Sequence, residues 1–109
     1  MNTVKTGELE INDEIKKVTV DGDEIKLTPI EYNILYFLTL NKGKVFSTQK
    51  LYDSIWKEDS YGTENIVAVH ICHIREKIEI NPKDPKYLKV VWGIGYKIED
   101  IKGGHYERK

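Results

Sequence analysis

The chain has 109 residues, a hydrophobic content of 39% and a net charge of −1, which are typical of one small folded domain over residues 1–109. It has no apolar run of the roughly 18 residues that a membrane span needs, and its first residues do not resemble a signal peptide. Cys72 is the single cysteine and cannot form an internal disulfide, so a reducing cytoplasm is the expected compartment.

Charge is distributed unevenly along the chain. Residues 1–64 carry 8 Lys and Arg against 12 Asp and Glu, whereas residues 65–109 carry 9 against 6. A local positive field permits docking onto phosphates even when the whole chain is slightly acidic. An asymmetry of this size also arises by chance, so it permits nucleic-acid binding without demonstrating it.

Residues 7–27 are expected to form three short antiparallel strands. Polar and apolar residues alternate over residues 8–11 and 24–27, and residues 17–20 lead into the tight-turn sequence Asp21-Gly22-Asp23. This pattern predicts a small sheet with one wet face.

Two helices are expected next. Thr28 caps the first, Pro29 occupies its first position and Glu31 completes a capping box, while Gly43 belongs to a left-handed stop after residue 40. Ser47 is expected to cap a second helix over residues 48–56, with Leu51, Ile55 and Trp56 on its buried side.

A third helix is expected from residue 63 or 64 to residue 79. Four apolar residues form one stripe that faces the core: Val67, Ile71, Ile74 and Ile78. At about 100° per residue, the opposite side carries Asn65, Val69, Cys72, His73 and Glu76.

Pro82 and Pro85 then enforce a loop, and residues 88–91 and 96–98 are expected to form a hairpin around Trp92-Gly93-Ile94-Gly95. The resulting fold class is α+β: a winged helix-turn-helix with an N-terminal antiparallel sheet, three helices and a C-terminal β-hairpin wing.

The motifs LTPIEYNILYFL, GKVFSTQKLYDSIW, NIVAVHICHIREKI and VVWGIGYKI together resemble the DNA-binding effector domain of OmpR/PhoB-type response regulators. The resemblance covers about residues 7–99. Asn65, His73 and Trp92 are similar to the vancomycin-resistance regulator branch in particular.

The resemblance implies transcription regulation in a two-component system, through binding of double-stranded DNA at direct-repeat half-sites. It also implies a homodimer that forms through a receiver domain, which this sequence does not include, so we expect an excised effector domain or a stand-alone relative. The loop before the third helix is implied to contact RNA polymerase through Lys57, Glu58, Asp59, Ser60 and Tyr61.

The candidate DNA contacts lie on the third helix and the wing. On the helix they are Asn65, Ile66, Val69, His70, Cys72, His73, Arg75 and Lys77. On the wing and its flanks they are Lys89, Trp92, Gly93, Tyr96 and Lys97.

Several helix residues allow two interpretations. His73 stands where many relatives have arginine, and we expect it to contact a base edge or phosphate. Cys72 is interpreted as a thymine-methyl contact, a plain thiol or, less favoured, a redox switch. Asn65 either contacts phosphate or caps the helix, and His70 either contacts phosphate or packs on the second helix.

The remaining alternatives concern packing and charge. Val69 is expected to touch a thymine methyl or to pack in the groove. Glu76 repels phosphate unless it accepts from cytosine or orients His73 or a nearby lysine. Trp92 replaces the wing arginine of many relatives, and we expect it to be partly packed with some backbone contact. Tyr96 is interpreted first as a core residue, with a phosphate contact of its hydroxyl as the alternative.

Sequence-specific DNA binding competes with one other function. The outer helix face has no arginine at its centre, so an interaction module with weakened DNA binding is the alternative. No catalytic spacing or phosphate-binding loop is present, so an enzyme is not expected. His70, His73 and Cys72 do not supply four converging metal ligands, and neither a metal nor a cofactor is expected.

Overall fold

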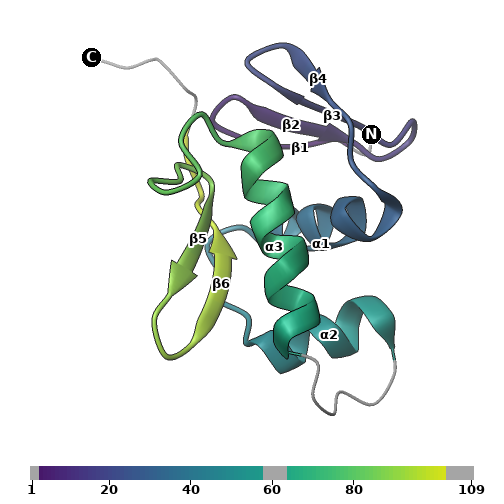
Figure 1. Ribbon diagram of the computed structural model, residues 1–109. Helices are drawn as coiled ribbons and strands as arrows, with labels where there is room; N and C mark the ends of the chain where they lie inside the picture. The colour runs from purple at the N-terminus through teal and green to yellow at the C-terminus, as the bar shows by residue number, and fades with distance from the viewer. Residues whose placement is uncertain (1–2, 58–63, 103–109) are drawn as a thin grey trace.

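The computed structural model describes residues 3–57 and 64–102, and its elements follow the expected order (Figure 1). They are β1 (Thr3–Thr6), β2 (Leu9–Asn12), β3 (Lys17–Val20), β4 (Asp23–Ile25), α1 (Pro29–Leu40), α2 (Thr48–Trp56), α3 (Glu64–Ile78), β5 (Leu88–Val91) and β6 (Gly95–Ile98). This arrangement confirms the α+β winged helix-turn-helix class.

The N-terminal sheet has four strands, one more than expected. They pair antiparallel in the order β1-β2-β3-β4, and β1 is the strand that the sequence pattern missed. Its residues, TVKT, contain a single strongly apolar side chain. Pairing with β2 and hydrogen bonds from distant residues hold it: Thr6 Oγ1 donates to Glu99 O at 2.6 Å and accepts from Ile101 N at 2.7 Å.

The predicted helix starts are confirmed. Thr28 Oγ1 accepts from Glu31 N at 3.3 Å, and Glu31 Oε1 accepts from Thr28 N at 2.9 Å, which completes the capping box of α1. Ser47 Oγ accepts from Lys50 N at 3.0 Å and caps α2. Leu51 is buried as expected, but Tyr52 is the second buried residue of α2, ahead of the half-buried Ile55 and Trp56.

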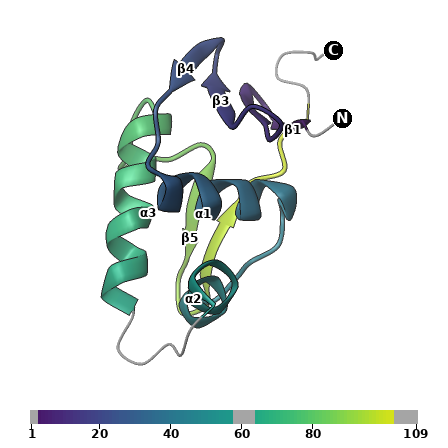
Figure 2. The same cartoon turned by 90° about the vertical axis from the view of Figure 1, so that its right-hand side faces the viewer.

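The core lies where α3 packs on α1 and α2, and where α1 meets both sheets. All four residues of the predicted α3 stripe are buried, together with Ile34, Leu35 and Leu38 of α1 and Ile98 of β6. Figure 2 shows α3 along one side of α1 and α2, with the hairpin β5–β6 behind them. The inner face of α3 is therefore used for packing and its outer face is left uncovered by other elements.

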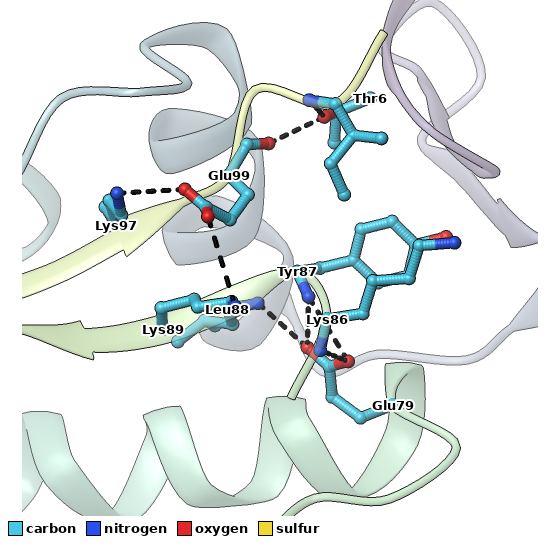
Figure 3. A network of polar contacts seen from close by, with 9 residues as sticks. Thr6, Glu79, Lys86, Tyr87, Leu88, Lys89, Lys97 and Glu99 are labelled. Atoms are coloured by element: carbon cyan, nitrogen blue, oxygen red, sulfur yellow. Dashed lines mark hydrogen bonds and ion pairs between the residues drawn. The ribbon is translucent and has the colours of Figure 1, made fainter. Parts of the chain in front are cut away.

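The base of the hairpin is held to the end of α3 by one carboxylate (Figure 3). Glu79 follows α3 directly, is 7% exposed, and accepts from three successive amides of residues 86–88 at 2.7 to 3.0 Å. Because these amides lie just before and at the start of β5, Glu79 sets where the wing begins relative to α3.

A glycine fixes the other strand of the hairpin. Tyr96 exchanges two backbone hydrogen bonds of 2.9 Å with Phe46, which brings the chain before α2 onto β6. A Cβ added to Gly95 would lie 2.0 Å from the Phe46 carbonyl oxygen. Only glycine permits this approach.

Across residues 3–57 and 64–102, no helix is long and apolar enough to cross a membrane.

Candidate nucleic-acid interface

The outer face of α3 carries the residues that its periodicity predicted. Asn65, Val69, Cys72, His73 and Glu76 are all exposed, and Ile66 is exposed beside them. The face is thus a mixture of small apolar and neutral polar groups with a single negative charge. Such a surface can make methyl contacts and single hydrogen bonds in a groove.

The wing tip is more exposed than expected. Ile94 N donates to Val91 O at 3.0 Å and closes a turn in which Gly93 has a φ of +77°, a conformation that favours glycine. Trp92 lies at this turn and is 91% exposed. The prediction that Trp92 is partly packed is wrong: the tight turn directs it away from the hairpin, and Ile94 beside it is also exposed.

Glu31, His73 and Lys77 form a polar seam, which joins α3 to the first turn of α1. Lys77 Nζ donates to Glu31 Oε1 at 2.6 Å, and His73 Nδ1 lies 3.8 Å from Glu31 Oε2. Burial raises the pKa of Glu31, but the hydrogen bonds from Lys77 and Thr28 outweigh it and bring that pKa below its ordinary value. Two candidate DNA contacts therefore share one buried carboxylate.

His70 is placed on the flank of α3 against α2. Its ring centroid lies 5.7 Å from that of Trp56, and the side chain is half-buried. Of the two interpretations for this residue, the structure brings together the groups required for packing on the second helix.

The wing lysines face one another across the hairpin. Lys89 pairs with Lys97 in the strand register, and both reach Glu99, at 4.0 Å and 2.9 Å respectively. The hydrogen bond from Lys97 lowers the pKa of Glu99 below its ordinary value, against the opposing effect of burial. Glu99 therefore holds two like charges together on one side of the wing (Figure 3).

The other candidates are separately placed. Arg75 is half-buried and has no ion pair among the described residues. Tyr96 is half-buried and packs against the core. Lys57 is the C-cap of α2, with a left-handed φ of 60°, whereas Glu58, Asp59, Ser60 and Tyr61 lie outside the described residues. Within the described ranges, no group of three or more His, Cys, Asp or Glu could hold a metal ion.

Sequence reasoning assigned no tertiary role to Glu31 or Glu79. Glu31 was identified only as a capping-box residue, and its partner Lys77 is 46 residues away. The apolar pattern that surrounds both glutamates was the available signal, because a carboxylate among buried positions requires partners.

An uncovered helix face beside an exposed β-hairpin tip, both carried on a three-helix core, defines a winged helix-turn-helix domain. Residues 22–98 match the family model described as "Transcriptional regulatory protein, C terminal". The chain belongs to this family, the OmpR/PhoB type of DNA-binding domain, which confirms the resemblance. The family consists of regulators and is not an enzyme class.

The comparisons with individual proteins agree. The chain is 45% identical over 78 residues to the regulatory protein VanRc of Enterococcus gallinarum, covering 72% of this chain and 34% of that protein. Response regulator DrrB of Thermotoga maritima, an OmpR/PhoB homolog, has a TM-score of 0.82 and 34% identity, covering 90% of this chain and 44% of DrrB.

A third similar structure is the AdeR DNA-binding domain in complex with an intercistronic region. Its TM-score is 0.74 at 25% identity, covering 88% of this chain and 98% of that one. The chain spans less than half the length of the curated relatives it matches.

Proposed function

We propose that this chain binds double-stranded DNA in a sequence-specific manner, as the effector domain of a two-component response regulator. The observation that carries the proposal is the uncovered outer face of α3 beside the exposed wing tip (Figure 1). The major groove, about 12 Å wide, admits an α-helix, and the hairpin is then placed to contact the adjacent backbone or minor groove.

The contacts divide by chemistry. His73, Cys72 and Val69 are proposed as base contacts, because they lie on the outer face and offer a hydrogen-bonding ring and small apolar groups. Lys89 and Lys97 are proposed as phosphate contacts. Each contact should make the slope of log affinity against log salt steeper, by about −0.9.

Three further properties follow from the family and are proposed with it. A receiver domain would dimerise the regulator and place two copies on direct repeats. Residues 57–61 would contact RNA polymerase. The expected compartment is the cytoplasm, because a transcription regulator acts where the chromosome lies.

The charges of the described residues favour one alternative, a protein-interaction module. Lys77, Lys89 and Lys97 are each paired with a glutamate, and the outer face of α3 has no arginine at its centre. Both features would weaken binding to phosphate.

Selection from a random duplex pool, followed by fluorescence anisotropy at two salt concentrations, separates these functions. DNA binding predicts a selected sequence and an affinity that falls with salt. Neither would be seen for the interaction module. In matched variants, His73→Ala should change the sequence preference, whereas Lys89→Ala should weaken all duplexes alike. Uniform effects of both would contradict the division into base and phosphate contacts.

A further inference from the structure

The outward-facing His73 lies beside a buried carboxylate of another helix. His73 is 50% exposed, whereas the Glu31 side chain that its Nδ1 approaches is 3% exposed. The other oxygen of Glu31, Oε1, accepts from Lys77 Nζ at 2.6 Å and from the Thr28 amide at 2.9 Å. Oε2 is therefore the oxygen that faces the imidazole.

A carboxylate in this position discriminates between the two neutral forms of the ring. Neutral histidine carries its proton on Nδ1 or on Nε2, and the other nitrogen is then an acceptor. The 3.8 Å separation is longer than a hydrogen bond. At this range, a negative charge still attracts an N–H dipole and repels a ring lone pair. An ionised Glu31 therefore favours the proton on Nδ1.

We propose that Glu31 is a positioning residue, which holds neutral His73 as the Nδ1–H tautomer and leaves Nε2 as an acceptor on the outer face of α3. The inference rests on the proposed binding of α3 in the major groove. Adenine N6 and cytosine N4 are donors there, whereas guanine presents the acceptors N7 and O6.

His73 is thus a specificity residue for an adenine or cytosine amino group. An arginine at the same position has only donors and would select guanine instead. A histidine that faces a buried carboxylate therefore reads a different base from the one that an arginine would read at this position.

The tautomer is tested first, on the free protein. Nitrogen-15 NMR of the His73 ring, at a pH where it is neutral, should show mainly the Nδ1–H form in the wild type. Glu31→Gln should shift the population toward Nε2–H. Lys77→Met is the matched control. It removes the charged partner of the same carboxylate but leaves Oε2 facing His73, and it should keep the Nδ1–H form.

Two results of this NMR measurement overturn the positioning role. The first is a dominant Nε2–H form in the wild type, which needs no variant to fold. The second is an equal loss of the Nδ1–H form in Glu31→Gln and Lys77→Met, which would show that any disturbance of the seam has the same effect.

Base preference is tested next, with duplexes that differ only at the position where His73→Ala relaxes selectivity. The wild type should prefer adenine or cytosine over guanine by about fivefold, the value of one net hydrogen bond. Glu31→Gln should lose this preference, and Lys77→Met should keep it even where it weakens every duplex.

A wild-type preference for guanine, or an unchanged preference in Glu31→Gln, overturns the positioning role and leaves DNA binding intact. Failure to select any duplex overturns the proposed function instead. In that case, the tautomer measurement on the free protein still decides whether Glu31 positions His73.

Discussion

Two buried glutamates hold α3, and their hydrogen-bonding partners are of opposite kinds. Glu79, at the end of the helix, accepts from three backbone amides of residues 86–88. Glu31, on α1, accepts from one backbone amide but also from the charged Lys77, and it faces His73. Both buried carboxylates are satisfied by hydrogen bonds, but only Glu31 has a charged partner.

We call Glu79 with its three backbone amides the fixed joint, and Glu31 with Lys77 and His73 the adjustable joint. Backbone amides in a loop move only if the loop moves, so Glu79 determines the position of the wing relative to α3. Side chains such as Lys77 and His73 can rotate without moving the helix, so Glu31 affects the groups that α3 presents. The first joint should therefore dominate stability and the second should dominate recognition.

The largest expected effect comes from the fixed joint. Glu79→Ala should lower the free energy of unfolding by about 3 kcal/mol, because three amides lose their acceptor, as measured by urea denaturation. Glu79→Gln keeps one acceptor oxygen and should lose about half as much. The exposed Glu76→Ala is the control and should stay within about 0.5 kcal/mol. Equal effects at residues 76 and 79 would contradict the fixed joint.

The second fixed contact of the wing is expected to be next in size. Gly95→Ala places a Cβ against the Phe46 carbonyl oxygen and should lower the free energy of unfolding by about 2 kcal/mol. The NMR contacts between Phe46 and Tyr96 should be lost at the same time. If those contacts persist at full stability, the close approach does not require glycine.

The adjustable joint should matter less for stability. Glu31→Gln removes the charged partner of Lys77 and should cost about 1.5 kcal/mol, because Lys77 can turn to solvent. A loss larger than that of Glu79→Ala would reverse the comparison.

Acid titration isolates the charge of Glu31. The pKa of Glu31 in the folded state is lowered from an ordinary value of 4.5. The contribution of its charge to the free energy of unfolding is therefore fully present above that value, and is lost as pH falls through the lower folded-state pKa. The stability gap between wild type and Glu31→Gln should be constant above about pH 5 and shrink below it. Asp13 and Glu99 also have lowered pKa values, so they contribute to the loss of stability in acid as well. The difference between wild type and Glu31→Gln removes their contribution, because both proteins contain them. A gap unchanged to about pH 3 would contradict the assignment.

The smallest effect on stability is expected at the wing tip. Trp92→Ala should change the free energy of unfolding by less than about 0.5 kcal/mol, since the side chain is exposed. It should weaken DNA binding without changing the salt dependence. If the new arginine reaches a phosphate, Trp92→Arg should make the slope of log affinity against log salt steeper, by about −0.9. An unchanged affinity in Trp92→Ala would remove the tip from the interface.

Local patterns were sufficient for most of the fold. The capping residues Thr28 and Ser47 placed the starts of α1 and α2, because a cap is satisfied by amides two or three residues away. The α3 stripe and its exposed outer face followed from periodicity alone. Strand β1 could not be predicted, because its four residues have little apolar character and are held by β2 and by residues 99 and 101.

The helix starts, the two faces of α3 and the hairpin follow from local residue patterns, since each depends on neighbours a few residues apart. The contacts that hold the interface residues depend instead on long-range packing. Lys77 reaches Glu31 across 46 positions. The side chain of Trp92 is left exposed at the hairpin turn, and the close approach of Phe46 requires a glycine at residue 95. These facts depend on which segments meet in space, and no short-range pattern encodes that meeting.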